Sequence, residues 1–400
     1  MKLRNFKCRY ELRLATSVAF IFLLTVGSPI ATQTQVDDDG EKSFKLALRF
    51  EPGATYKINA SANAGGQLRF LIDDATKAQR RKWEGDLLLD ISIDADENVR
   101  MVGAEGDALI EMRLNSLSIK GIALERKVNI IATPKRVLIS IGNEMHLDTG
   151  ALREEQRKRI HTLLFAPVML TLRPNGKIVT ITGLERLQLI IPRVDVQRAL
   201  AKLPPLLPDK PMKIGDEWVR EIKLPPFIFE QPVTLPIKFR LVQVAQDDTS
   251  KHKVATIEVS AKLEMQDKKV WIHPPQLSQP VQAHVEQGTF AIEGKVQFDM
   301  TAGILQCVNM RMDMEFNGYA DVSRKVMKQM ERRRVAPDEI LRPRGEEAGD
   351  NKQAEGDAGA QPQEAPKADE GKEAEVETIR VRTDATLTAA FTVEWRLVRE

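Results

Sequence analysis

Three methionines and a phenylalanine share one face of a predicted strand, and they are the residues best suited to an apolar ligand. Met310, Met312, Met314 and Phe316 alternate with polar residues over positions 308–317. Because methionine side chains are flexible and polarizable, such a row can adapt to apolar ligands of different shapes. An ordinary sheet core would have the same pattern, so the sequence leaves both interpretations open.

Residue patterns that would support catalysis or metal binding do not occur in this sequence. No histidine pair has the spacing of a helical zinc site, and no Gly-x-Ser-x-Gly motif marks a nucleophilic serine. Cys307 falls on a predicted strand with no histidine near it in sequence, which favours a small buried side chain over a nucleophile. We therefore predict no enzyme, no catalytic residue, no cofactor and no metal ion.

Composition excludes several classes of protein. The chain has 400 residues, of which 42% are hydrophobic and 29% are charged, as in ordinary globular proteins. Only 14 Phe, 4 Trp and 3 Tyr are present, which argues against a nucleic-acid surface built on stacked rings. No nucleic-acid partner is expected.

The first 31 residues predict a secretory signal peptide. A head with five basic residues precedes the uncharged apolar run Leu14–Val26, and small residues follow. The run is short for a membrane span, so we expect a cleaved signal and no integral span afterwards, with an uncleaved anchor as the alternative. Removing residues 1–31 leaves 54 basic and 56 acidic side chains, so the net charge changes from +2 to −2. The expected location is periplasmic or extracellular.

Alternation of apolar and polar residues dominates the rest of the chain. We expect residues 32–43 to be a flexible leader, 44–203 a β-rich first half, and 204–335 a β-rich second half. Helices are expected near 150–166 and 184–203, and a basic helix over 321–335. A turn at Pro174-Asn175-Gly176 predicts a hairpin. The proline-rich stretch 204–236 is expected to be extended and irregular and to separate the halves.

The end of the chain combines an acidic segment with a regular strand. Residues 336–377 hold 13 acidic and 5 basic side chains and no aromatic, so they predict a disordered insert. Residues 378–400 alternate again, which predicts a C-terminal strand that returns to the sheet. The fold class expected from these patterns is mainly β with minor α: antiparallel, curved sheet or sheets in two related halves, with a few helices.

A motif in the second half resembles one found in exported bacterial proteins of unknown function. The segment Leu207–Trp218 has a proline, a basic residue, an apolar residue and then Gly-Asp-x-Trp. A strand, a glycine turn and a long strand follow at Gly294–Met314, as in those proteins. The resemblance implies a β-rich envelope or secreted domain and no known activity.

Two functions remain open from the sequence. The first is a non-enzymatic binding or scaffold module for another envelope protein, and the second is a carrier of lipid or another apolar ligand in a cavity of a curved sheet. The Met310–Phe316 row is the candidate ligand face for the second.

Overall fold

The computed structural model describes residues 31–36, 42–74, 79–123, 125–184, 203–224, 233–247, 250–272, 281–323 and 378–398. Within these ranges the chain is mostly strand and contains one α-helix. The first part of the chain contains β1 Ala31–Val36, β2 Lys42–Ala47, β3 Thr55–Asp74, β4 Gln79–Val102, β5 Ala108–Ala123, β6 Arg126–Ala132, β7 Val137–Ile141, β8 Glu144–Asp148, the 3-10 helix η1 Thr149–Ala151 and α2 Glu154–Phe165. The second part contains β9 Val168–Leu172, β10 Ile178–Thr182, β11 Glu217–Leu224, β12 Val233–Gln246, β13 Lys253–Ile272, β14 Val281–Asp299, β15 Ile304–Ser323 and β16 Thr378–Val398.

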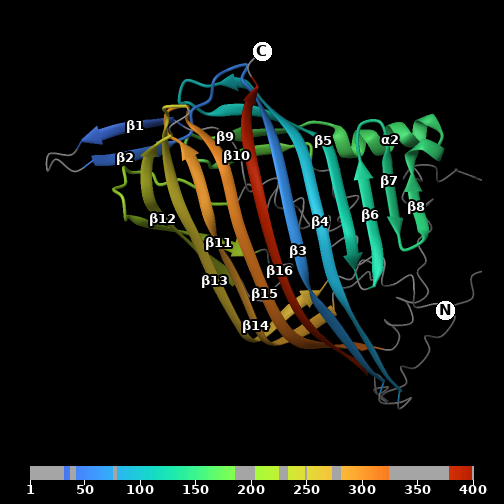
Figure 1. Ribbon diagram of the computed structural model, residues 1–400. Helices are drawn as coiled ribbons and strands as arrows, with labels where there is room; N and C mark the ends of the chain where they lie inside the picture. Colours follow the sequence, from blue (N-terminus) through green and yellow to red (C-terminus); the bar gives the residue numbers. More distant parts are fainter. Residues whose placement is uncertain are drawn as a thin grey trace, which may run out of the picture.

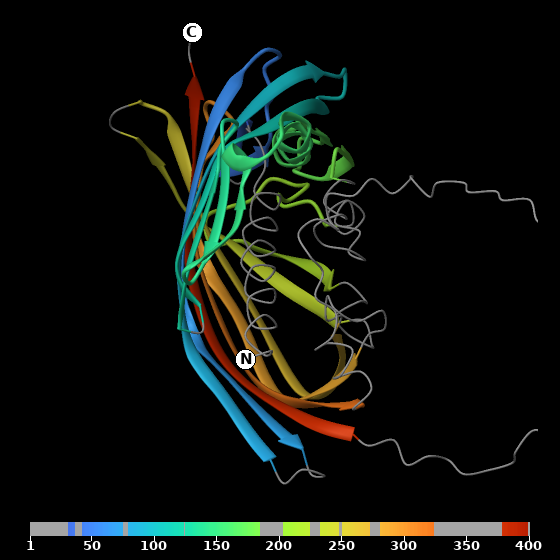
Figure 2. The same ribbon diagram turned by 90° about the vertical axis from the view of Figure 1, so that its right-hand side faces the viewer.

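Fourteen strands form one antiparallel, unclosed sheet, and β1 and β2 form a separate pair. The order across the sheet is β11-β12-β13-β14-β15-β16-β3-β4-β5-β6-β7-β8, and the hairpin β9–β10 is attached to β5. Figure 1 shows the long strands side by side, and Figure 2 shows that the sheet is strongly bowed, with α2 on its hollow side. We call the hollow side the inner face and the opposite side the outer face.

The last strand lies in the middle of the sheet. β16 pairs with β15 along one side, as in Met310 opposite Phe391, and with β3 along the other, as in Phe391 opposite Ala62. The two parts of the chain therefore meet through β16 in one continuous sheet rather than in two separate domains.

A second layer covers the inner face at one end of the sheet. Residues of β2, of β9–β10 and of the segment 203–215 pack there against sheet residues such as Ile58, Phe298 and Val393 in the largest apolar cluster. A pair of backbone hydrogen bonds between Phe44 and Met212 ties β2 to that segment. Helix α2 packs on the same face farther along, where Ile160 contacts Ala132 and Val137.

The structure confirms the predicted fold class: mainly β, antiparallel and curved, with little helix. The hairpin at Pro174-Asn175-Gly176 joins β9 to β10, and Gly176 has a φ of +81°, a conformation that glycine adopts without strain. The predicted helix near 150–166 corresponds to η1 and α2.

Three expectations need correction. The segment 32–43 is not a featureless leader, because β1 and the start of β2 lie in it and pair with each other. Residues 321–323 continue β15 and pair with β16 at 378–380, so the expected basic helix does not begin there. The proline-rich stretch 204–236 contains β11 and the start of β12. Pro236 pairs with Glu221 of β11, and the β12–β13 register begins at the next residue, Ile237.

Other predictions lie outside the described residues. These are residues 1–30 of the signal predicted over 1–31, most of the helix near 184–203, the insert 336–377 and the rest of the basic helix.

Candidate functional site

The structure places the predicted ligand row on the inner face of β15. Met310 packs against the largest apolar cluster, and Met312, Met314 and Phe316 follow at every second position, so all four point to the same side. All four are half-buried. Their partners on β16 are Phe391, Ala389, Leu387 and Ala385, in that order.

These four residues belong to apolar rows that cross the sheet. Because directly paired residues of an antiparallel sheet share a face, the strand registers define each row. One row runs from β12 to β7 through Phe239, Val259, Gly294, Met310, Phe391, Ala62, Ile91, Ile119, Ile130 and Ile139. The next runs through Ile237, Ala261, Ile292, Met312, Ala389, Ala64, Leu89, Gly121, Val128 and Ile141. A third, from β13 to β5, contains Leu263, Phe290, Met314, Leu387, Gly66, Leu87 and Ala123. Each row consists entirely of apolar residues and glycine.

Side-chain size varies along these rows. On β3 the inner positions are Ala60, Ala62, Ala64 and Gly66, whereas β4 presents isoleucine and leucine and β15 presents methionine. Gly66 cannot be replaced without a shift, since an added Cβ would lie 2.0 Å from the backbone oxygen of Thr386. The inner side chains of β3 are therefore smaller than those of β4 and β15.

The outer face is polar and its side chains bond to one another across strands. The Thr392 hydroxyl donates to Asn309 Oδ1 at 2.7 Å, and the Thr388 hydroxyl donates to Asp313 Oδ1 at 2.7 Å. Arg311 forms a two-pronged ion pair with Asp313, at 2.9 and 3.1 Å. The Asp313 pKa is lowered by the hydrogen bonds from Arg311 and Thr388.

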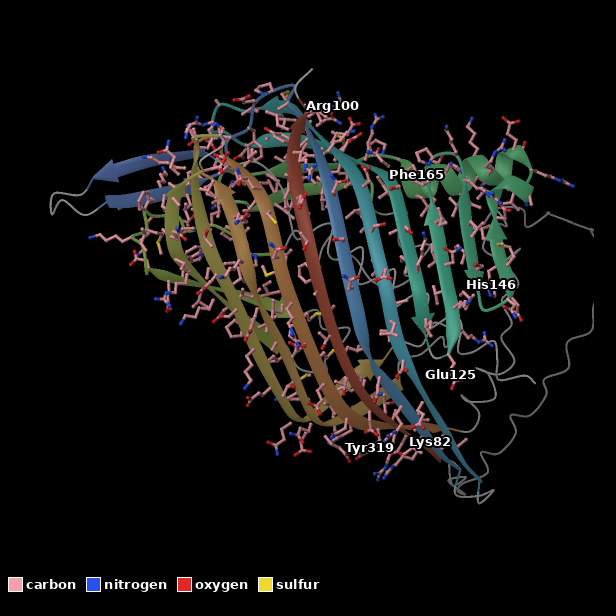
Figure 3. The ribbon with its side chains drawn as sticks, in the orientation of Figure 1. Lys82, Arg100, Glu125, His146, Phe165 and Tyr319 are labelled. Carbon is pink, nitrogen blue, oxygen red and sulfur yellow. The ribbon has the colours of Figure 1, made fainter. Side chains whose placement is uncertain are left out.

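Near the covered end of the sheet, Glu111 is the centre of a charged cluster on the outer face. Its carboxylate accepts hydrogen bonds from Arg100, at 2.8 Å to Nε, and from Arg113. Burial alone would raise the Glu111 pKa, but the two arginines outweigh it and hold the pKa below its usual value. Figure 3 shows Arg100 at this end of the molecule.

At the far end, an aromatic and charged cluster spans β14 to β16 on the outer face. The rings of His284 and Tyr319 stack with centroids 5.2 Å apart, and the Arg380 guanidinium lies 4.4 Å from the centre of the Tyr319 ring. Arg380 also binds Asp321 through two hydrogen bonds of 2.7 and 2.8 Å. These contacts join neighbouring strands, and Figure 3 labels Tyr319 at this end.

Two shallow depressions on the outer face share a boundary at Ser61 and Thr392. One, of about 320 Å³, is bounded by residues of β3, β4, β5 and β16, and the other, of about 460 Å³, by residues of β3 and β13–β16. We call the two together the outer groove. Its polar lining consists of nine hydroxyl or amide side chains and five charged ones.

Buried polar groups within the core have structural contacts. Glu97 is fully buried opposite Tyr56, whose pKa rises to about 12, mainly through burial and also through the charges of Glu97 and Glu51. Asp299 is buried at the β14–β15 turn, where it accepts hydrogen bonds from the backbone of Thr301 and Ala302 and lies 2.7 Å from His252 Nδ1.

That aspartate–histidine pair does not complete a catalytic triad with the serine nearest in sequence. Ser250 donates its hydroxyl to Asp247 at 2.5 Å and accepts the backbone N–H of His252 at 3.2 Å, so it closes the β12–β13 turn. We assign these contacts to turn formation.

Cys307 lies on β15 between Gln297 and Glu394. Its pKa is raised, first by burial and then by the charge of Glu394, which reduces the thiolate fraction that nucleophilic attack requires. In the described part of the chain, no group of three His, Cys, Asp or Glu side chains is arranged to hold a metal ion.

The Gly-Asp-x-Trp motif has a local structural explanation. Gly215 has a φ of +97°, and Asp216 accepts the backbone N–H of Lys213 at 2.7 Å, which closes the turn before β11. Trp218 then stacks on Phe239, with ring centroids 5.3 Å apart, and donates its indole N–H to Leu206 O at 3.1 Å. The motif anchors the segment 203–215 to the sheet.

The sequence identified one strand of the inner surface but not its extent. Alternation predicted an apolar face for each strand separately, including Met310–Phe316, whereas the rows depend on pairing between distant segments. Gly66 was a signal in the sequence of close approach between β3 and a neighbouring strand.

No protein-family model and no curated protein matches this chain. Among the described residues, no helix is both long enough and apolar enough to span a membrane.

Proposed function

We propose that the inner face binds an apolar ligand with an extended hydrocarbon chain, and that the protein acts as an exported, non-enzymatic carrier. The single observation that supports this most strongly is the set of three uninterrupted apolar rows across seven to ten strands, in which side chains of β14 and β15 such as Phe290, Ile292 and Met314 are only half-buried. Burial of apolar surface is the main source of affinity for such a ligand, at about 25 cal/mol per Å².

The exposure of the methionine row also supports the proposal. Met310, Met312 and Met314 are half-buried, so each retains accessible surface on the inner face. Flexible methionine side chains can repack around chains of different length or saturation. Docking of another envelope protein on this face is the alternative function.

Export is part of the proposal and depends on the predicted signal over residues 1–31. A hydrocarbon ligand has very low solubility in water, so a carrier would be useful in an aqueous compartment between membranes.

A matched pair of variants on β15 tests the proposal. Met314→Gln keeps the length of the side chain but adds a polar amide on the inner face, whereas Glu315→Gln changes the adjacent residue, which is exposed. Saturable binding of cis-parinaric acid, displaced by palmitate, is expected for the wild-type protein. We expect Met314→Gln to weaken binding about fivefold, equivalent to ~1 kcal/mol, with Glu315→Gln unchanged.

The absence of saturable binding by the folded wild-type protein would contradict the proposal. An equal loss of affinity in both variants would also contradict it, because the inner face would then have no special role. Thermal unfolding of each variant checks that the fold is retained.

A further inference from the structure

We infer that the outer groove is a second binding site, for an extended, uncharged polysaccharide chain that lies across the strands. This site is on the opposite side of the sheet from the proposed hydrocarbon site and does not depend on it. The inference is based on the shape of the groove, the free hydrogen-bonding groups on its floor and the pairing of the charges at its rim.

The shape of the groove follows from side-chain length. Strand register places Asn309, Thr392, Ser61, Ser92 and Ser118 in one row on the outer face of β15, β16, β3, β4 and β5. Short side chains at the centre of the sheet leave a depression between longer ones. The two parts of the groove together reach from β13 to β5, which is seven strands or about 29 Å at the usual strand spacing.

The floor of the groove offers unused hydrogen-bonding capacity. Among the described contacts, the side chains of Asn59, Ser61, Asn63, Ser92 and Ser116 form no hydrogen bond within the protein. Each serine can donate one hydrogen bond and accept two, and each asparagine amide can donate two and accept two. Other polar side chains that line the groove are bonded to a neighbour, as in Thr392 with Asn309 and Asp94 with Asn115. The free serine and asparagine side chains are therefore the groups that can bind a ligand.

The charges at the rim favour an uncharged ligand. Arg311 is paired with Asp313 at 2.9 Å, and Lys295 lies 3.9 Å from Glu258. Glu394 accepts a hydrogen bond from Arg396 at 2.9 Å. Because these cations are already compensated, the groove lacks the free cations that a phosphate or nucleic acid would need. The carboxylates of Asp94, which lies between Asn59 and Ser116, and of Glu293 also line the groove and disfavour an anionic chain. Sugar hydroxyls, which donate and accept, match serine and asparagine side chains.

Binding of defined oligosaccharides tests the inference. The probes are cellohexaose and the hexamer of N-acetylglucosamine as extended neutral chains, maltohexaose as a curled neutral chain, and heparin as a charged one, each by calorimetric titration. We expect the wild-type protein to bind at least one extended neutral hexamer and to prefer it over maltohexaose and heparin.

A second pair of variants locates the site. Ser61→Lys adds a long charged side chain to the groove floor, and Thr386→Lys adds the same side chain on β16 at an exposed position outside the groove. Ser61→Lys should weaken binding of the hexamer about tenfold or more, equivalent to ~1.4 kcal/mol, and Thr386→Lys should leave it unchanged. Thermal unfolding checks that both variants are folded. If the hydrocarbon site exists, both variants should also bind cis-parinaric acid as the wild type does.

Three results would overturn the inference. They are no binding of any hexamer by the wild-type protein, equal binding by the two lysine variants, and binding of heparin alone. Met314→Gln should not change hexamer affinity, so failure of the hydrocarbon site and failure of the polysaccharide site are separate outcomes.

Discussion

The two faces of β4 differ in burial although their residues alternate in a single strand. Leu87, Leu89, Ile91 and Ile93 are buried on the inner face, whereas Leu88, Asp90 and Ser92 between them are exposed. The inner residues gain stability by leaving water and packing into rows, and the outer ones remain solvated or bond to neighbouring strands. The comparison teaches that strand register decides whether a side chain lies on the inner or the outer face. The face in turn determines whether the residue contributes to a core, to a ligand surface or to a polar groove.

The largest expected effect comes from placing one charge on each face. Ile91→Lys puts an ammonium group among buried aliphatic side chains, while Ser92→Lys puts it in water beside Asp90 and Asp94. We expect Ile91→Lys to lose about 4 kcal/mol or more of unfolding free energy, or not to fold, and Ser92→Lys to change it by about 0.5 kcal/mol at most. Urea denaturation measures both, and similar losses would show that the two faces are not distinct.

Alkaline pH should act on the inner face through Tyr56. Its pKa is raised to about 12, so the folded state disfavours the phenolate. The stability that this provides is fully present below the unfolded-state pKa near 10 and is lost as pH rises toward 12. The loss should be on the order of 2 kcal/mol in the wild type and should be absent from Tyr56→Phe. Urea denaturation between pH 9 and 12 (about the range set by these two values) measures it, with Tyr319→Phe as the control. A Tyr56→Phe profile parallel to that of the wild type would contradict this prediction.

Acidic pH should act on the outer face through Glu111, with a smaller effect. The Glu111 pKa is lowered in the folded state, so its carboxylate contributes to the free energy of unfolding above the unfolded-state pKa of 4.5. That contribution is lost as pH falls through the folded-state pKa. Because Arg100 and Arg113 are half exposed, we expect Glu111→Gln to cost only about 1 kcal/mol at neutral pH. The difference between wild type and variant should shrink as pH falls below 4.5, and a constant difference would exclude an ionic origin.

The fold was largely predictable because alternation reports which side of a strand is buried. The hairpin at Gly176, the helix near 150–166 and the strand at Met310–Phe316 all follow from local pattern. Pairing between distant segments is not local, so the register that sets Met310 beside Phe391 could not be read from the sequence. The same reason explains the errors at 32–43, predicted to be a flexible leader, and at 321–323, predicted to begin a basic helix. In both segments, partners elsewhere in the chain complete a strand.

The position of β16 has a consequence for how the molecule folds. β16 follows every other strand of the sheet in chain order, yet it separates β15 from β3. While the chain is being synthesised, those two strands therefore face solvent with unpaired backbone groups, a situation that invites aggregation. Completion of the sheet must wait until β16 has been synthesised, so the joining of β15 to β3 through β16 is a late step in this topology.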